Sequence, residues 1–345
     1  MAEAVTIVGG GLAGLTLGIG LRQRDVPVAV WEAGSYPRHR VCGEFISGRG
    51  QESLKRLNIY PKLRNESAHG FANTVAFYSG KRKVPPRSLP EPALSISRYV
   101  LDEFLANEFQ KLGGELYTGE RWLDGYGEGI VRANGRRVET TADGWRLFGM
   151  KIHARGVRLA ADLEMHFLRD GYVGASRLPD GEVNICGLFR SKTTVPDLSH
   201  RWRDWLGGPA DSRIHNHIAD AELDEKSFCA VAGFSLRPQY AMNFTECCVG
   251  DALTMIPPLT GNGMSMAFES AELAVDPLTK YSRGKLTWEQ AQQRIAQACD
   301  AAFSRRLRWA SWLQRILFHP QGRSILVFLT TRSERVWRSL FGNTR

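Results

Sequence analysis

Residues 5–14 read VTIVGGGLAG, and this stretch decides the fold that the sequence predicts. The β-branched run at 5–8 predicts a short buried strand, and residues 12–24 have the composition of a helix. A second hydrophobic run at 28–31 predicts another strand, which leads directly to Glu32. Strand, glycine-rich turn, helix, strand and acidic residue follow one another in the order of a dinucleotide-binding βαβ unit.

The three glycines of this turn and the acidic residue give the unit its chemistry. Gly9, Gly11 and Gly14 allow the backbone to turn tightly and to approach a pyrophosphate at the N-terminus of the helix. Glu32 lies 21 residues after Gly11, where a carboxylate can accept hydrogen bonds from both ribose hydroxyls, and Ala33 follows it. A carboxylate there disfavours a 2′-phosphate, so the stretch predicts FAD or NAD as the tightly held nucleotide rather than NADP.

A second glycine-rich stretch, residues 250–264, reads GDALTMIPPLTGNGM and leads into a helical pattern. It resembles the late motif of the flavoproteins of the geranylgeranyl-reductase and aromatic-hydroxylase superfamily, which has the form GDAxxxxxPxxGxGxxxAxxSA. The resemblance implies non-covalently bound FAD, with Asp251 at the ribityl chain and Pro258 beside the ring. It also implies that the backbone of the next turn meets the pyrimidine carbonyl of the flavin, at Gly261, Asn262, Gly263 and Met264. A helix N-terminus beside the ring stabilises the negative charge that a flavin gains on reduction.

Residues 37–44, PRHRVCGE, resemble the PxxKxCGE signature of the geranylgeranyl-reductase branch, with Arg40 at the position of the lysine. This resemblance implies that Arg40 and Cys42 lie at the cofactor. It also implies that the Cys42 thiol approaches both flavin and substrate, where it could supply a proton. Arg98, at the start of an expected helix over 98–112, matches the arginine with which the family contacts the cofactor.

The middle of the chain changes to a β pattern. Apolar and polar residues alternate over 163–167, and residues 172–189 read as strand, turn and strand. Tyr172 is a candidate catalytic residue because it could line a substrate cavity, and His153 and His166 could face the same cavity. The YxWxFP-type substrate motif of the reductases and the WxWxIP motif of tryptophan halogenases are both absent from the sequence, which leaves the substrate open.

These patterns predict an α/β protein with a Rossmann-type FAD-binding domain, an inserted β-sheet substrate domain and a helical C-terminus. We expect the first part of the FAD-binding domain at 1–150 and the β-rich substrate domain at 151–235. The second part of the FAD-binding domain is expected at 236–300, and a basic amphipathic helical C-terminus at 301–345.

The net charge of +9 is concentrated at the C-terminus. Residues 301–345 hold nine arginines and one glutamate, a local balance of +8, so no general basic face for nucleic acid is expected. Over 303–341, apolar residues alternate with arginine at helical spacing, broken by Pro320 and Gly322. The arginines at 305–308 are typical of a solvated helix face. Our hypothesis is that two short helices here contact an anionic membrane surface reversibly and in a salt-sensitive way.

Six cysteines show neither CxxC spacing nor the density of a disulfide scaffold, and no stretch is long enough to span a membrane. The N-terminus enters a strand within four residues, which leaves no room for a signal peptide. We therefore expect a cytoplasmic protein with reduced thiols. His215 and His217 have HxH spacing without a third ligand nearby in the sequence, so no metal site is predicted.

The sequence thus predicts a flavin-dependent oxidoreductase that takes electrons from NAD(P)H, bound transiently because a second GxGxxG is absent. Two reactions on a hydrophobic small molecule stay open: reduction of a carbon–carbon double bond in an isoprenoid-like substrate, and hydroxylation of an aromatic or polyketide substrate by a monooxygenase. Halogenation and oxidase chemistry are lesser alternatives. A non-catalytic FAD-binding module is the alternative of another class. The PPLTGNGM loop argues against it, because holding the nucleotide alone does not require that geometry.

Overall fold

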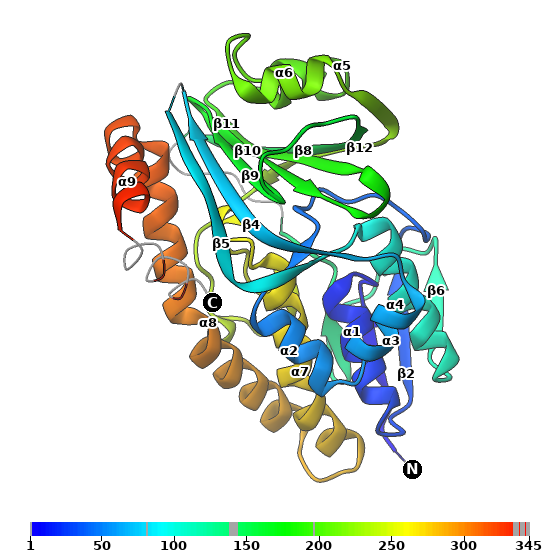
Figure 1. The fold of residues 1–345 in the computed structure, drawn as a ribbon. Coiled ribbons are helices and arrows are strands. Elements are labelled where there is room, and N and C mark those ends of the chain that lie inside the picture. The colour runs from blue at the N-terminus through cyan, green and yellow to red at the C-terminus, as the bar shows by residue number, and fades with distance from the viewer. Residues whose placement is uncertain are drawn as a thin grey trace.

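The computed structural model of the chain describes residues 2–80, 82–137, 144–195 and 197–333, together with Arg338 and Gly342. Figure 1 shows two sheets at different levels of the molecule, with helices of the C-terminal part along one side of both. One sheet has five strands and the other has eight. The predicted combination of an α/β half with a β-sheet layer and C-terminal helices is therefore confirmed.

The five-stranded sheet is parallel and has the order β13-β7-β1-β2-β6. Its strands are β1 (Val5–Val8), β2 (Val28–Glu32), β6 (Glu115–Thr118), β7 (Ile130–Arg132) and β13 (Cys247–Cys248). The register pairs Val8 with Trp31, so the glycine-rich turn after β1 and Glu32 at the end of β2 lie at the same edge of the sheet. This edge carries the predicted nucleotide-binding residues.

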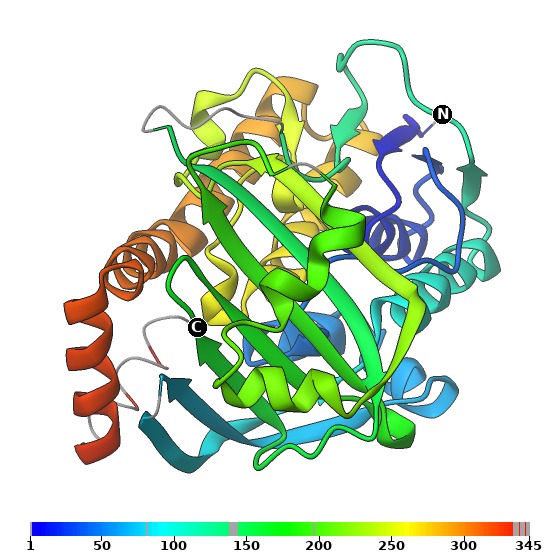
Figure 2. The ribbon, with the colours of Figure 1, turned by 90° about the horizontal axis from the view of Figure 1, so that it is seen from above.

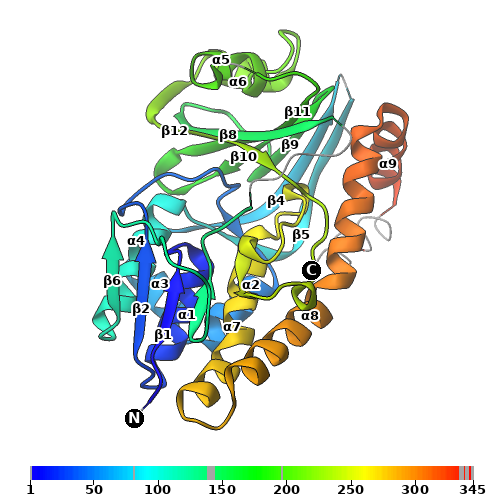
Figure 3. The same cartoon turned by 180° about the vertical axis from the view of Figure 1, so that it is seen from behind.

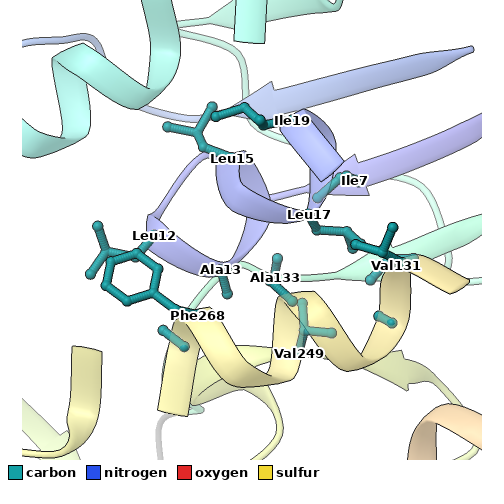
Figure 4. Close-up of a cluster of buried hydrophobic side chains, with 14 of the residues drawn as sticks. Ile7, Leu12, Ala13, Leu15, Leu17, Ile19, Val131, Ala133, Val249 and Phe268 are labelled. Atoms are coloured by element: carbon teal, nitrogen blue, oxygen red, sulfur yellow. The ribbon is translucent and has the colours of Figure 1, made fainter. Parts of the chain in front are cut away.

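Helix α1 (Leu12–Arg22) lies at the centre of the core of this half. Every residue of α1 except Arg22 is buried, because the small and apolar sequence LAGLTLGIGL lets neighbours pack on all of its sides. It packs against α4 (Arg98–Lys111) and α7 (Gly263–Ser282). Figure 4 shows Leu12 and Ala13 beside Phe268 and Ala133. Two short helices, α2 (Arg49–Arg56) and α3 (Tyr60–Glu66), complete this half.

The eight-stranded sheet has the order β12-β8-β11-β10-β9-β4-β5-β3, with β4 and β9 parallel and the other neighbours antiparallel. Its strands are β3 (Phe45–Ile46), β4 (Gly70–Ser79), β5 (Arg82–Ser95), β8 (Arg146–Arg155), β9 (Leu163–Phe167), β10 (Gly171–Arg177), β11 (Val183–Ser191) and β12 (Glu222–Phe234). The expected strand, turn and strand at 172–189 are β10 and β11, joined at η1 (Pro179–Gly181).

The eight-stranded sheet begins earlier in the chain than the expected boundary at residue 150. Strands β3, β4 and β5 come from within 1–150, yet they pair with the strands of 151–235. The reason is the parallel pairing of β4 with β9, which aligns Val75 with Leu163, 88 positions later in the chain. Long-range pairing of this kind leaves no local signal in the sequence.

Helices cover one face of the eight-stranded sheet, which we call the outer face. Helices α5 (Leu198–Leu206) and α6 (Arg213–Ala219) lie across it, as Figure 2 shows from above. Trp202 and Leu206 pack there against Phe148 and Ile152 of β8. The opposite face, the inner face, is turned toward the carboxyl edge of the parallel sheet.

The C-terminal part forms α8 (Trp288–Phe318) and α9 (Pro320–Arg332). A capping box of Thr287 and Gln290 begins α8, and the expected break occurs at Pro320, whereas Gly322 lies inside α9. Figure 3 shows α8 extending from the level of the parallel sheet to that of the eight-stranded sheet. Of the expected segment 301–345, residues 334–337, 339–341 and 343–345 lie outside the described residues. Each helix within the described ranges is too short or too polar to cross a membrane.

Arg306 departs from the expectation of a solvated helix face. Its side chain is 4% exposed and forms two hydrogen bonds with the carboxylate of Glu269 on α7, at 2.7 and 2.6 Å. The neighbouring Arg305 and Arg308 are exposed. One arginine of the run therefore belongs to the contact between α7 and α8, because its position on the helix faces α7 rather than solvent.

Candidate active site

A cavity of about 960 Å³ lies between the carboxyl edge of the parallel sheet and the inner face of the eight-stranded sheet. Most of the residues predicted from the sequence line it: Gly9, Gly11, Glu32, Ala33, Arg40, Cys42, Arg98, Tyr172, Asp251, Pro258, Gly261, Gly263 and Met264. Gly14 and Asn262 are buried next to this wall and do not line the cavity. The fold thus brings five separate stretches of sequence to one cavity.

The glycines of the wall divide into two groups. A Cβ atom on Gly9 would lie 2.3 Å from the carbonyl oxygen of Ala133, and one on Gly14 would lie 1.9 Å from the carbonyl oxygen of Gly9. These two glycines are required by the protein's own backbone, and Gly9 also has a φ of +116°. A Cβ on Gly11 or Gly263 would meet no described atom within 4 Å. Both stand at the N-terminus of a helix, so their space is free for a ligand that approaches the helix N–H groups.

Three donors hold the Glu32 carboxylate at the end of β2. Its Oε2 accepts a hydrogen bond from the N–H of Gly10 at 2.9 Å, and its Oε1 accepts from the N–H of Gly34 and from Nη1 of Arg38, both at 2.8 Å. Burial acts to raise the pKa of Glu32, but the hydrogen bond and charge of Arg38 outweigh burial and hold the pKa below its usual value. The group is therefore a carboxylate at neutral pH, as binding of ribose hydroxyls requires.

Arg38 is a candidate binding residue that the sequence analysis missed. It lines the cavity beside Glu32, and its Nε and Nη2 are buried without a hydrogen-bond partner among the described residues. Buried guanidinium N–H groups need acceptors. The phosphate and ribose oxygens of a dinucleotide supply such acceptors, so this end of the cavity fits FAD. The signal was present in the sequence, since Arg38 belongs to the same PRHRVCGE segment as Arg40.

Asp251 and Arg98 form another part of the cavity wall. Burial raises the pKa of Asp251 to about 6, although Arg98 and Arg136 act to lower it. Arg98 is oriented by Asp102, whose carboxylate accepts from Nε at 2.6 Å and from Nη2 at 2.8 Å. A carboxyl group that is enclosed by protein yet open to the cavity can hydrogen-bond a ligand hydroxyl, which is the role predicted for Asp251.

The turn before α7 is built closely against β3. Residues 258–260 form a 3₁₀ turn, η4 (Pro258–Thr260), and Gly261 follows with a φ of +64°. A Cβ atom on Gly261 would lie 2.5 Å from the Phe45 ring. Helix α7 then begins at Gly263, so its N-terminus lies at the cavity. The positive end of the helix dipole is therefore available to a ligand that gains negative charge.

Cys42 lies on a loop that the inner face of the eight-stranded sheet holds in place. Asn184 Nδ2 donates to the carbonyl oxygen of Cys42 at 2.9 Å, and Ser176 Oγ donates to that of Gly43 at 2.7 Å. Burial raises the pKa of the Cys42 thiol, and Arg98 opposes this only in part. Cys42 is therefore a protonated thiol at neutral pH, which suits a proton donor better than a nucleophile.

A cluster of buried charges supports the Cys42 loop, and the sequence analysis missed it. Lys151 Nζ donates to Glu44 Oε1 at 2.5 Å, and both side chains are 0% exposed. His153 Nε2 lies 2.6 Å from Glu44 Oε2, and its Nδ1 lies 3.1 Å from Glu182 Oε2. Burial acts to lower the pKa of His153, but the bonds with Glu182 and Glu44 outweigh burial and raise it. His153 thus belongs to this cluster instead of lining the cavity, and its Nε2 also lies 2.8 Å from Lys151 Nζ.

The rest of the cavity is walled by apolar side chains. They come from the inner face of the sheet and from α8 and α9: Phe77, Leu163, Met165, Phe167, Leu188, Val231, Phe234, Leu313, Leu317 and Leu326. Tyr172 is 5% exposed on this wall, and its hydroxyl has no hydrogen-bond partner among the described residues. Burial raises the pKa of Tyr172, so the phenol is neutral. His166, by contrast, lies on the outer face beside α6.

No family model matches the chain. The chain is 27% identical over 319 residues to conditioned medium factor receptor 1 of Dictyostelium discoideum, with 78% of this chain and 62% of that relative covered, so it spans less than two thirds of that protein. It is 22% identical over 358 residues to a menaquinone reductase of Mycolicibacterium smegmatis, covering 91% and 85%. It is 21% identical over 339 residues to a squalene monooxygenase of Eremothecium gossypii, covering 78% and 68%.

Solved structures share the fold over nearly the whole chain. The flavin-dependent brominase Bmp2 superposes with a TM-score of 0.76 at 14% identity, covering 99% of this chain and 94% of that one. A mutant of the halogenase PltM in complex with FAD gives a TM-score of 0.73 at 16% identity, covering 99% and 83%. At this identity the likeness establishes the fold. Taken with the sequence matches and the cavity geometry, it places the chain in the superfamily of FAD-dependent oxidoreductases.

Proposed function

We propose that the chain binds FAD in the cavity and reduces a carbon–carbon double bond of an apolar, isoprenoid-like substrate with electrons from NAD(P)H. The observation that carries this proposal is the juxtaposition of an apolar compartment, the ring-side turn at Pro258 and the protonated Cys42 thiol on one cavity wall. Glu32 and Arg38 would hold the adenosine end, and Asp251 the ribityl chain. The N-terminus of α7 would lie beside the ring.

Reduction of a double bond adds a hydride to one carbon and a proton to the other. Bound FAD supplies the hydride chemistry when it has been reduced. The proton must come from the protein or from water. Cys42 carries a proton at neutral pH and its loop is fixed by Asn184 and Ser176, so the Cys42 thiol is the proposed donor. The thiolate that remains would be reprotonated through the polar end of the cavity.

The role proposed for Tyr172 is to orient the substrate. Its neutral hydroxyl lies in the apolar compartment without a partner among the described residues, so it can donate a hydrogen bond to a polar end of the substrate. Such a bond would orient the double bond toward the ring. NAD(P)H is proposed to bind only transiently, since the GxGxxG and Glu32 serve the tightly bound nucleotide.

A monooxygenase is the second candidate function. The match to a squalene monooxygenase favours this second candidate, because that relative belongs to the same superfamily and the alignment covers 78% of this chain. The same apolar compartment would accept its substrate. The two functions differ in whether oxygen is consumed and whether an oxygen atom enters the product.

Mass spectrometry of the product separates the two candidates. Purified, FAD-loaded protein is given NADH or NADPH and an isoprenoid-chain compound, with menaquinone as the first choice because a relative bears that name. A gain of two hydrogens under nitrogen that remains after the quinone ring has been reoxidised in air supports the reductase, because reduction of the ring alone is reversed by that step. A gain of one oxygen atom, seen only in air, supports the monooxygenase. Protein that fails to take up FAD at micromolar concentration refutes both.

Membrane contact through the C-terminal helices is part of the proposal. Leu313, Leu317 and Leu326 line the cavity, whereas the outward-facing Trp312 and Phe328 are 46% and 50% exposed. The same two helices therefore connect the substrate compartment with an exposed apolar surface, which would give a lipid-soluble substrate a short path from a bilayer.

Sedimentation with anionic vesicles tests this contact. The wild type should co-sediment at low salt and be released at high salt, because each arginine near an anionic surface contributes about 1 kcal/mol. Trp312→Ser with Phe328→Ser should reduce binding, while Leu123→Ser, at a position 87% exposed in another part of the molecule, should not. Absence of binding at low salt contradicts the idea.

A further inference from the structure

A second cluster of ligand-type side chains lies on the outer face of the eight-stranded sheet. Glu164 and His166 come from β9, and His217 comes from α6. Glu164 Oε2 lies 3.0 Å from His166 Nε2 and 3.1 Å from His217 Nε2. The three ligand atoms all lie within 4.8 Å of one another. We propose that these residues bind a divalent zinc ion that fastens α6 to the sheet.

The spacing of the three atoms matches the coordination geometry of zinc. A tetrahedral zinc ion with ligand distances of about 2.0–2.1 Å places its ligand atoms about 3.3 Å apart. The two measured separations, 3.0 and 3.1 Å, need only a small outward shift of the side chains. Two imidazole nitrogens and one carboxylate oxygen form a donor set that zinc accepts. Magnesium and calcium prefer oxygen ligands throughout, so the two histidines disfavour them.

Neighbouring groups already orient the ligands. Glu164 Oε1 accepts a hydrogen bond from the N–H of Ala160 at 2.6 Å and one from the Tyr78 hydroxyl at 3.4 Å. These bonds leave Oε2 directed toward the two histidines. The Tyr78 ring is stacked on the His166 ring with a centroid distance of 4.7 Å. Fixed ligands of this kind raise metal affinity, because little side-chain freedom is lost on binding.

The cluster is largely buried and has one open side. Glu164 and His166 are 2% and 3% exposed, while the His217 side chain is 9% exposed and marks the open side. Three protein ligands and one water at that open side would complete a tetrahedron. The two β9 ligands are separated from His217 by about 50 positions of sequence, so an ion here joins distant parts of the substrate-side layer.

One feature opposes a cation at this place. Arg213 Nε lies 3.8 Å from Glu164 Oε2, and the guanidinium lies 5.0 Å from the centroid of the Tyr78 ring. The Arg213 side chain is 42% exposed, so it can turn into solvent when the ion binds. The free energy needed to move Arg213 away from Glu164 reduces the affinity of the site for zinc. Removal of its charge should therefore strengthen binding, which provides a variant that keeps all three ligands.

Zinc titration of chelator-treated protein tests the site. The wild type should bind one zinc ion per chain at submicromolar concentration by calorimetry, and its midpoint of thermal unfolding should rise with added zinc. Bound cobalt(II) should give the visible absorption of a tetrahedral site. His217→Gln should weaken zinc binding at least a hundredfold. The matched control His215→Gln, on the same helix and outside the cluster, should bind as the wild type does.

Two results overturn the proposal. The first is a wild type that binds no zinc at these concentrations, which would assign the cluster to hydrogen bonds alone. The second is equal zinc binding by the wild type and His217→Gln, which would place the ion elsewhere. Should His217→Gln fail to fold, Arg213→Gln decides the question: it should bind zinc several-fold more tightly than the wild type, and unchanged or weaker binding overturns the site.

Discussion

Replacing Lys151 with methionine should destabilise the protein by about 3–5 kcal/mol, the cost of breaking a buried ion pair by removing one partner. Lys151 Nζ lies 2.5 Å from Glu44 Oε1, and neither side chain is exposed. Methionine is similar in length but carries no charge, so Glu44 would remain ionised in the interior with His153 as its nearest cationic neighbour. The loss corresponds to roughly two to three and a half orders of magnitude in the folding equilibrium.

An exposed ion pair of the same residue types provides the control. Lys55 Nζ lies 2.7 Å from Glu52 Oε1, but these side chains are 49% and 52% exposed. Lys55→Met should cost less than about 1 kcal/mol, because solvent screens the pair. The double variant Lys151→Met/Glu44→Gln should be more stable than the sum of its single changes predicts, since it leaves no unpaired buried charge.

Urea unfolding at neutral pH, followed by tryptophan fluorescence, compares Lys151→Met, Glu44→Gln, their double variant and Lys55→Met with the wild type. The expected order of midpoints has Lys55→Met close to the wild type and Lys151→Met far below it. If Lys151→Met and Lys55→Met unfold at the same urea concentration, the buried cluster does not support the Cys42 loop in the way inferred here. Strict additivity in the double variant would also contradict direct coupling of Glu44 and Lys151.

Three further outcomes are expected at the site and its supporting charges. Asp251→Ala should weaken FAD binding roughly 10- to 150-fold, because a hydrogen bond from a ligand hydroxyl to a charged group contributes about 1.5–3 kcal/mol; a titration of flavin-free protein that gives the wild-type dissociation constant would exclude this role. Cys42→Ser should retain FAD and slow turnover at least tenfold, since general acid catalysis contributes about 10²- to 10⁴-fold; unchanged turnover would assign the thiol to packing. The raised pKa of His153 stabilises the folded protein fully below about pH 6.5, and this contribution is lost as pH rises through the folded-state pKa. His153→Gln should therefore flatten the alkaline decline of the urea midpoint, and an equally steep decline in that variant would rule out His153 as its source.

The nucleotide-binding half could be predicted from the sequence because its signals are local. The turn at 9–14 and the acid at Glu32 belong to one continuous βαβ unit, and the late stretch 250–264 combines two 3₁₀ turns with the start of a helix. Each of these motifs requires particular residue types at fixed spacing, independently of the rest of the chain. The positions of these residues on one cavity wall follow from the parallel pairing of β1 and β2 and from the place of α7.

The charged contacts could not be predicted because they depend on distant pairing. Lys151 meets Glu44 across 107 positions, and Arg306 meets Glu269 across 37. In the sequence, Lys151 is one polar residue in an alternating strand, and Arg306 is one of several arginines in a helix. The available signal for Lys151 was a charged residue at a strand position that faces the protein interior. Nothing in the sequence identifies Glu44 as its partner. His217 likewise acquires its neighbours only when α6 lies on β9.

Helix α8 both contacts α7 and contributes to the apolar wall of the cavity. Arg306 forms a buried pair with Glu269 of α7, and two turns later Leu313 and Leu317 line the apolar compartment. Helix α7 begins at Gly263, which lines the same cavity. Because this ion pair joins α7 to α8, it links the turn at the start of α7 with the helix that carries part of the apolar wall. If the cavity holds FAD and an apolar substrate as proposed, a larger side chain at Leu317 should shorten the accepted apolar chain and leave the turn at 258–263 unchanged.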